Sequence, residues 1–563
     1  MTMTIRRWTI LLAAIGLLWG IAACAPPPRP AAHEQVLYEA LTGDPKSLNP
    51  VIAKESSTTD VTNLLMEGLT KVAMPSLEIK PALAERWEHD TAGTTWTFHL
   101  RPNLKWSDGQ PLTSADVVFT FNRLIFNDAI PSSSRDVLQV DGKPFLVSAP
   151  DSLTVVFALP APYAPFLLSA GATEILPEHI LGPQLAAGTF NSSWGVGTPP
   201  EQIVGAGAFR LKELVPGQRV VVERNPYYWR NGENGDTFPK LDRIVLTVVP
   251  DQNAELLKFK SGELDLLTVR GEDFADLQAG AAAGGYTMYQ PGPTLSTMFL
   301  FFNQTPGGST PVKRAWFTDV QFRRAVAHAI DRETIVRNVF HGLAQPAWTD
   351  VSPALTNFHN PNVARYPYDL AKAKALLDAA GYVDRNGDGI REDAHGNPVE
   401  FVLTTNSEST QRVSIATLIL DDLKKLGFKV SFTPMQFNAL CNNLNEGRGW
   451  EACIMGLTGT LDPNNGRNVW HSSGQLHMWY PREPQPATPW EAEIDGIFDR
   501  AVKELDPAKR QALYFRWQEI SAEQLPLIHT VVPQSLYAVR NRVQGLRPAP
   551  LSLAHNIDEW SIQ

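Results

Sequence analysis

The segment DRNGDGIRED, which begins at Asp384, has the spacing in this chain that comes nearest to a metal site. Asp384, Asn386 and Asp388 stand at alternate positions, and Gly389 follows where a calcium-binding loop makes its sharp turn. The twelfth position of such a loop normally holds a glutamate that binds calcium through both oxygens, whereas this chain has His395 there. The spacing therefore leaves two interpretations open: a weak calcium site, or a polar turn between a helix and a strand.

Motifs of the common enzyme classes are not found in the sequence. There is no GxxxxGK[ST] phosphate loop and no GxSxG nucleophile elbow, and Gly205-Ala206-Gly207 lacks the third glycine of a dinucleotide-binding loop and fits a tight turn. We therefore expect no enzyme and no cofactor. Because catalytic carboxylates are often assembled from distant segments, an envelope hydrolase with a dispersed active site is kept as the alternative from a different functional class.

The N-terminal segment has the composition of an export signal. Arg6 and Arg7 precede an uncharged apolar run that ends in the sequence IAAC at Cys24. This sequence resembles a bacterial lipobox, in which Cys24 would become the first mature residue and carry a lipid. An uncleaved membrane anchor is the alternative, because the apolar run is only a little shorter than the about 20 residues that a membrane span needs. We expect a lipoprotein signal peptide over residues 1–23 and a proline-rich tether over residues 24–33.

The other two cysteines are Cys441 and Cys453. An even number of cysteines in an exported chain favours a disulfide between them. Closing so short a loop would stabilise the fold by roughly 3 kcal/mol. Two buried thiols are the alternative.

Length and charge limit the kind of protein. The 563 residues suffice for at least two lobes. The formal net charge is -10, and the basic residues are scattered singly or in pairs. Since phosphate backbones are bound by clustered lysine and arginine, we expect no nucleic acid partner.

Helices and strands alternate along the chain, which predicts a mixed α/β fold. The residues TWTFHL predict a strand, and Thr113 and Asp116 are spaced as a capping box for a helix that continues to Leu124. A helix within NAELLKFKS is expected to stop at Gly262. Further helices are expected over residues 59–69, 322–330, 332–340, 369–380 and 413–426.

The order of motifs along the chain resembles that of a known family. These motifs are SLNP, EGLTKV, PALAERWE, WTFHLRPNLKWSDGQPLTSADVVFTFNR, ILPEHI, IVGAGAFRL, VVVERNPYYW, SGELDLL, VQFRRAVAHAIDRETI and DLAKAKALLDAAGY. They resemble the extracytoplasmic solute-binding proteins, family 5, of peptide ABC transporters. The resemblance implies an α/β, periplasmic-binding-protein-like fold (type II, cluster C), a two-lobed clamp with an extra small domain.

The resemblance also implies a division of the chain. Lobe I would consist of residues 34–71, 203–293 and 537–563, the small domain of residues 72–202, and lobe III of residues 294–536. Such a protein is the lipid-anchored, extracytoplasmic substrate-binding component of an ABC importer, expected as a monomer. It would bind a peptide or a related polar solute between its lobes and deliver the ligand to membrane permeases. An oligosaccharide or another non-peptide solute is the alternative ligand.

Family members that bind peptides hold the ligand's α-ammonium with an acidic residue shortly before a turn in lobe III. The matching turn here contains Asp462, and the place of the acid is taken by Thr460. A buried ammonium without a carboxylate partner is strongly disfavoured. The resemblance therefore implies either that Asp462 takes over after a small shift of the loop or that the ligand lacks a free amino group.

Four more positions match ligand-contacting positions of the family. Glu55 and Ser56 lie in the segment AKESST, which aligns with a ligand-contacting strand of lobe I. An ordinary loop turn is the alternative for these two residues. Phe437 aligns with a position that is often a pocket-lining Trp, and Thr530 with one that is often a Tyr. Ordinary core packing is the alternative for both.

Overall fold

The computed structural model describes residues 34–53, 55–74, 76–232, 235–550 and 552–563. Cys24, the predicted signal peptide and the predicted tether lie outside the described residues, so they stay predictions. Within the described ranges, no helix is both long and apolar enough to cross a membrane.

A four-stranded sheet joins segments that are far apart in the sequence. Its strands, in spatial order, are β1 (Val36–Leu41), β12 (Arg243–Val248), β11 (Arg219–Arg224) and β10 (Phe209–Val215). β1 runs parallel to β12, and β11 is antiparallel to both its neighbours. Ile244 and Leu246 are buried at alternate positions of β12, as the two-residue period of a strand requires.

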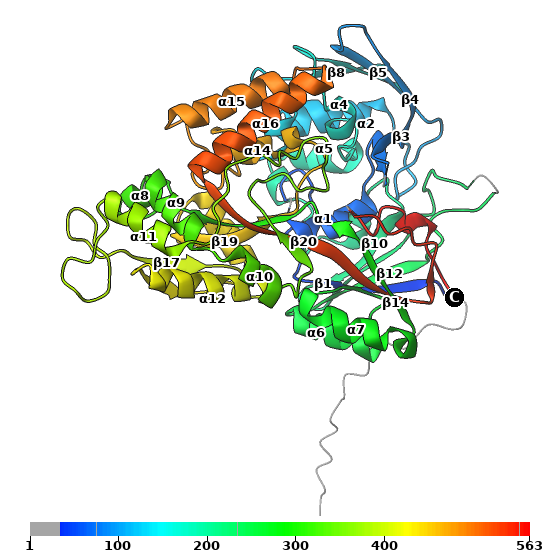
Figure 1. Cartoon of the computed structure of the whole chain (residues 1–563). Coiled ribbons are helices and arrows are strands. Elements are labelled where there is room, and N and C mark those ends of the chain that lie inside the picture. Colours follow the sequence, from blue (N-terminus) through cyan, green and yellow to red (C-terminus); the bar gives the residue numbers. More distant parts are fainter. Residues whose placement is uncertain (1–33, 54, 75, 233–234, 551) are drawn as a thin grey trace, which may run out of the picture. The chain divides into compact units, whose positions relative to one another are not determined.

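A second sheet is organised around β20 (Leu527–Arg540), which runs through the centre of the structure (Figure 1). The other strands of this sheet are β13 (Leu266–Thr268), β14 (Tyr286–Pro293), β15 (Thr297–Phe302), β16 (Ala344–Pro346), β17 (Glu400–Thr404), β18 (Lys429–Phe432) and β19 (Ala452–Leu457). The first half of β20 pairs with β15, and the second half pairs with β13 and β14. The predicted boundary between residues 536 and 537 falls inside this continuous strand.

A third sheet contains β4 (Ala84–His89), β5 (Thr95–Leu100), β9 (Thr154–Ala158) and β8 (Leu146–Asp151), all antiparallel. The predicted strand TWTFHL is β5. The predicted capping box is present, because the Thr113 hydroxyl accepts from Ala115 N and Asp116 Oδ2 accepts from Thr113 N. The helix begins as α2 (Ser114–Val118) and continues as a π-helix, η1 (Phe119–Ile125).

The remaining helices cover these sheets (Figure 1). They are α1 (Ser56–Leu65), α3 (Ser134–Val137), α4 (Phe166–Ser169), α5 (Glu178–Ala186), α6 (Gln252–Ser261), α7 (Gly271–Gly284), α8 (Pro311–Thr318), α9 (Val320–Ala329), α10 (Arg332–Asn338), α11 (Leu370–Ala379), α12 (Thr410–Lys425), α13 (Phe437–Glu446), α14 (Arg467–Trp470), α15 (Pro489–Ala501) and α16 (Pro507–Gln524). Short 3-10 helices are η2 (Phe190–Ser192), η3 (Pro200–Gln202), η4 (Pro463–Gly466) and η5 (Ile557–Glu559). Short strand pairs are β2 (Thr70–Ala73) with β3 (Glu78–Pro81), β6 (Gln139–Val140) with β7 (Lys143–Pro144), and β21 (Val543–Gln544) with β22 (Ser561–Ile562).

The predicted helix over residues 59–69 is shifted in the structure, where α1 spans Ser56–Leu65. The helix ends early because the Leu65 carbonyl accepts a hydrogen bond from Gly207 N at 2.8 Å. A Cβ at Gly205 would lie 2.0 Å from the same carbonyl oxygen, so the close approach requires glycine there. This contact accounts for the glycines of Gly205-Ala206-Gly207.

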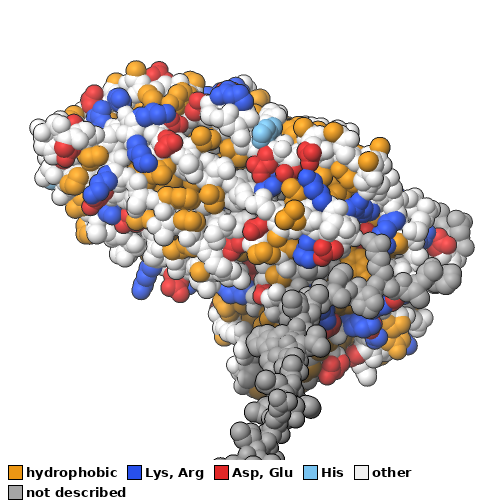
Figure 2. Space-filling model, turned by 90° about the horizontal axis from the view of Figure 1, so that it is seen from below, with side chains coloured by type: hydrophobic (Ala, Val, Ile, Leu, Met, Phe, Trp, Pro, Cys, Tyr) orange, Lys and Arg blue, Asp and Glu red, His pale blue; other side chains and the backbone are white. Residues whose placement is uncertain are grey.

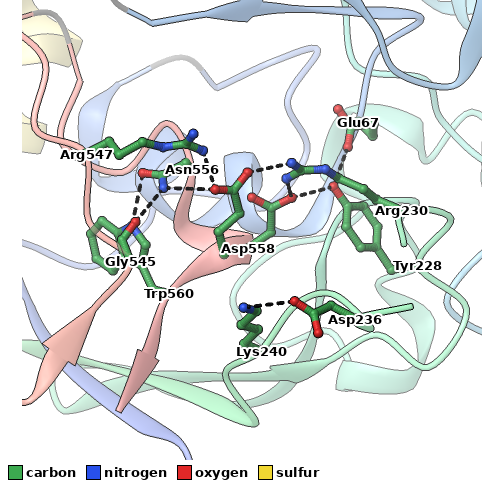
Figure 3. A network of polar contacts seen from close by, with 11 residues as sticks. Glu67, Tyr228, Arg230, Asp236, Lys240, Gly545, Arg547, Asn556, Asp558 and Trp560 are labelled. Atoms are coloured by element: carbon green, nitrogen blue, oxygen red, sulfur yellow. Dashed lines mark hydrogen bonds and ion pairs between the residues drawn. The ribbon is translucent and has the colours of Figure 1, made fainter. Parts of the chain in front are cut away.

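The C-terminal segment is bound to the rest of the fold by a polar network (Figure 3). Arg230 forms ion pairs with Asp558 and with Glu559, the latter at 2.5 Å. The Tyr228 hydroxyl lies 3.3 Å from both Glu67 Oε2 and Asp558 Oδ2. The contacts of Arg230 and Tyr228 with Asp558 and Glu559 join residues more than 300 positions apart, and they hold the C-terminal segment against the rest of the fold.

Candidate functional site

Two cavities meet at the carboxyl end of β19. The first has a volume of about 310 Å³ and the second about 200 Å³, and Leu457 and Thr458 line both. Residues 458–460 follow β19 without pairing to another strand. The second cavity is also lined by Pro533 and Gln534 of β20, the strand that links the two halves of the central sheet. The two cavities therefore flank the short segment that follows β19, in which Gly459 has a φ of +75°.

Asp350 places an acidic group in the first cavity. Its Oδ2 accepts a hydrogen bond from Trp470 Nε1 at 3.4 Å, and Trp470 itself lines the cavity. Burial raises the pKa of Asp350 to about 6. A carboxylate held in this way favours a cationic partner, because a positive charge would offset the cost of its desolvation.

Arg412 places a basic group in the second cavity. Its Nη1 donates to Asn406 Oδ1 at 2.8 Å, while its buried Nε has no hydrogen-bond partner in the described part of the chain. Burial lowers the pKa of Arg412 from its usual value, yet an arginine stays charged in proteins. The site thus offers the Asp350 carboxyl group on one side of the Leu457–Thr458 segment and the Arg412 guanidinium on the other.

Thr460 lines the first cavity, and its role in ligand binding stays a prediction. Its hydroxyl donates to the backbone carbonyl of Asp462 at 2.8 Å. The Asp462 carboxylate is buried and pairs with Arg510 through two contacts of 2.6 and 2.7 Å. Both Asp462 oxygens are therefore bound by a guanidinium, with which a ligand ammonium would have to share them. The role of Asp462 in ligand binding stays a prediction.

Glu55, Ser56 and Phe437 lie outside these two cavities. Glu55 is the residue before the first turn of α1, where its side chain makes no capping hydrogen bond to the helix backbone, and its Oε1 accepts from Lys46 N at 3.2 Å. The Lys46 ammonium donates to Asn442 in α13 at 3.0 Å, so the segment before α1 and the helix that begins at Phe437 lie close together. Their roles in ligand binding stay predictions.

Thr530 lies in the first half of β20 and is fully buried. Its hydroxyl donates to the Met298 carbonyl at 2.9 Å, and its own carbonyl accepts from Ala347 N. The hydroxyl and the carbonyl of Thr530 are thus bonded within the fold, as ordinary core packing would have it. Its role in ligand binding stays a prediction.

The predicted disulfide is not present in the structure, since Cys441 and Cys453 are free thiols. Cys453 lies in β19 inside an apolar cluster, and Cys441 lies in α13 at the edge of the same cluster. Burial raises the pKa of Cys441 to about 11 and that of Cys453 further. Both thiols are therefore protonated near neutral pH and poorly reactive.

A thiol-counting experiment checks this correction. In a chain carrying Cys24→Ser, we expect slow labelling of the folded protein and two reactive thiols after unfolding, without prior reduction. Dithiothreitol should leave the melting temperature unchanged. Two thiols that become reactive only after reduction would instead show that the disulfide forms.

The Asp384 loop has the geometry of a polar turn. Asp384 accepts from Gly387 N at 2.7 Å and Gly389 N at 2.9 Å, and Asp388 accepts from Ile390 N at 2.8 Å. Asn386 donates to Asp388 at 3.1 Å. The carboxylates of Asp384, Asp388 and Glu392 lie within 4.8 Å of one another. Since the loop amides already satisfy the aspartates, the turn explains the pattern, and calcium binding stays a prediction.

A larger cavity of about 580 Å³ lies beside the first sheet and is lined by several acidic residues. Burial raises the pKa of Glu39 and of Glu255 to about 7, and that of Asp60 to about 6. None of the site residues predicted from the sequence lines this cavity.

The long strand β20 pairs with β15 in its first half and with β13 and β14 in its second half. The cavities that Asp350 and Arg412 line lie near it. This arrangement is that of a two-lobed solute-binding protein. The family model for bacterial extracellular solute-binding proteins, family 5 Middle, matches residues 78–477. The chain belongs to this family, which consists of extracytoplasmic substrate-binding components of ABC importers rather than enzymes. The predicted family and fold class are confirmed.

Individual relatives agree with this assignment. A probable ABC transporter-binding protein of Deinococcus radiodurans is 30% identical over 89% of this chain and 87% of its own length. The oligopeptide-binding protein AppA of Bacillus subtilis, solved with a nonapeptide, is 26% identical and superposes with a TM-score of 0.81 over 94% of this chain and 99% of that one. MelB of Agrobacterium fabrum, solved with stachyose, shares the fold at 21% identity and a TM-score of 0.83 over 94% and 85% of the two chains.

Proposed function

We propose that this substrate-binding protein captures an extended peptide and delivers it to the permeases of its importer. One observation carries the proposal: Asp350 lines the cavity on one side of Leu457–Thr458, and Arg412 lines the cavity on the other side. A peptide main chain carries an ammonium at one end and a carboxylate at the other. Hydrogen bonds from the ligand to the backbone of residues 458–460 would supply affinity that does not depend on the ligand's side chains.

The proposal includes the division into lobes and the membrane anchor. Closure of lobe III over lobe I and the small domain would be driven by contacts that the ligand makes better in the closed state. A lipid on Cys24 would keep the monomeric protein at high effective concentration beside its permeases. Figure 2 shows basic and acidic side chains interspersed over the described part of one face, as expected for a protein whose anchor is a lipid rather than a basic surface.

An oligosaccharide is the second candidate ligand. Thr460 is uncharged where peptide binders of the family have an acid, and Trp470 and Trp517 line the first cavity. Indole rings give a sugar ring an apolar surface on which to stack. The relative MelB was solved with stachyose, so the fold accommodates such a ligand.

Native mass spectrometry of protein purified from its own host tests the proposal, because a retained ligand would be released and sequenced. We expect peptides of mixed sequence, and calorimetry with a synthetic copy should show one site per chain. Small-angle scattering should show a more compact protein with ligand than without it. A released oligosaccharide, or turnover of the added peptide, would overturn the peptide proposal.

A further inference from the structure

Three buried side chains converge where the irregular segment after α14 meets the first turn of α15, which contains Glu491. His477 is 0% exposed, Glu483 1% and Glu491 4%. Each residue offers a ligand atom within 4.8 Å of the other two. Two carboxylates and an imidazole in an apolar interior need compensation, because an unpaired buried charge is costly.

Three polar atoms of this cluster, His477 Nε2 and the two Glu483 oxygens, have no hydrogen-bond partner within the described residues. His477 Nδ1 lies 2.9 Å from the Val469 carbonyl, which only an N–H can satisfy, so Nε2 keeps its lone pair and has no hydrogen bond. Neither oxygen of Glu483 accepts a hydrogen bond of ordinary geometry. Burial raises the pKa of Glu483, while the Ala487 N–H, outside ordinary hydrogen-bond geometry, and the charge of Arg314 lower it. Arg314 Nε donates to the Gln304 carbonyl.

Glu491 is held in place by two other groups. Its Oε1 accepts from Trp479 Nε1 at 3.0 Å, and its Oε2 accepts from the Thr488 hydroxyl at 2.6 Å. Hydrogen bonds of this kind orient the ligands of metal sites. The bond from His477 Nδ1 to a backbone carbonyl has the same effect on the imidazole, because it fixes the tautomer that leaves Nε2 free to bind a metal.

We propose that His477, Glu483 and Glu491 bind a divalent metal ion of the Zn²⁺ class. The two carboxylates would neutralise its charge, and imidazole with carboxylate is a donor set that zinc accepts. A tetrahedral centre with bonds of about 2.1 Å places its ligand atoms about 3.4 Å apart. His477 Nε2 and Glu483 Oε2 are 3.7 Å apart and all three ligand atoms lie within 4.8 Å of one another, so the three side chains would draw closer together around the ion.

The ion would stabilise the wall of the first cavity. His477 is bonded to Val469, and Val469, Trp470 and Leu476 line that cavity. Trp479 packs against Trp470 at 5.6 Å between ring centroids. Metal binding does not depend on the proposed peptide ligand, and its test is separate.

Metal binding is tested on tag-free protein stripped with a chelator and then titrated with Zn²⁺. We expect one Zn²⁺ per chain and a rise in melting temperature on metal addition. Co²⁺ in place of Zn²⁺ should give visible bands without a thiolate charge-transfer band. Glu483→Gln and Glu491→Gln should each weaken Zn²⁺ binding about 100-fold or more, since loss of a merely supporting residue already costs 10–100-fold.

The controls separate this site from others. His89→Gln, at an exposed histidine, and the double variant Asp384→Asn with Asp388→Asn should bind Zn²⁺ as the wild type does. If a Glu483 variant fails to fold, the cobalt spectrum of the wild type still shows whether the protein binds the metal through nitrogen and oxygen ligands. Wild-type protein without stoichiometric Zn²⁺ binding, or with a thiolate cobalt spectrum, would overturn the proposal. Peptide affinity measured on the same samples reports independently on the proposed function.

Discussion

Asp350→Asn is expected to weaken the binding of a free-amino peptide by about 30-fold or more. The variant keeps the shape of the side chain but removes the acidic group that the first cavity offers to an ammonium. Loss of one partner of a buried charge pair costs about 2–5 kcal/mol, and 2 kcal/mol is about 30-fold in affinity. Isothermal titration calorimetry with a peptide identified from the native protein measures the change.

The pH dependence gives a second signature of the same residue. Burial raises the pKa of Asp350 to about 6, above its usual value. The wild type should therefore lose affinity for free-amino peptides as the pH falls through 6, because the neutral acid no longer attracts the ammonium. The same shift costs the unliganded protein stability as the pH rises from about 4 to about 6, since the folded state then holds more protons than the unfolded state. The asparagine variant should show neither effect.

Two comparisons make the Asp350 prediction specific. An N-acetylated peptide carries no ammonium, so the wild type and Asp350→Asn should bind it equally. Asp388→Asn, which changes an exposed acid in another loop, should leave the affinity for the free-amino peptide unchanged. If Asp350→Asn binds the free-amino peptide as tightly as the wild type does, the ammonium is held elsewhere.

The elements were predictable where local signals determine them. Asp369 accepts from Lys372 N at the start of α11, and Gly381 follows that helix with a φ of +88°. Gly262 ends α6 in the left-handed conformation with a φ of +82°, as predicted. The end of α1 was not predictable, because it depends on a hydrogen bond to Gly207, more than 140 residues further on.

The residues of the candidate site were harder to predict from the sequence than the helices and strands, because their roles also depend on contacts between residues far apart in the chain. Asp350 lies in a loop with no motif, and it gains its role from burial beside Trp470, 120 residues away. Arg412 lies within α12, and its place beside the end of β19 follows from the packing of that helix on the sheet. Asp462 matched a family turn, yet its partner Arg510 is 48 positions away and could not be inferred from the turn itself.

The pair that Arg510 forms with Asp462 explains how the segment after β19 is held. Arg510 Nε donates to the Ala501 carbonyl at 3.0 Å, and its guanidinium packs over the Tyr514 ring. Asp462 also accepts from Asn464 N at 2.9 Å, which caps the short helix η4. The pair thereby connects the loop of Thr460 to α16.

Arg510→Met is expected to lower the free energy of unfolding by about 3–5 kcal/mol, because it leaves the Asp462 carboxylate buried without a counter-charge. Asp462→Asn in the same background should recover part of the loss. Arg516 lies in α16, as Arg510 does, and forms an exposed pair with Glu493 of α15. Arg516→Met should therefore cost less than about 1 kcal/mol. Urea unfolding followed by circular dichroism compares the four proteins. Equal losses for Arg510→Met and Arg516→Met would show that the buried pair does not hold the segment, and that the cavity wall depends on apolar packing alone.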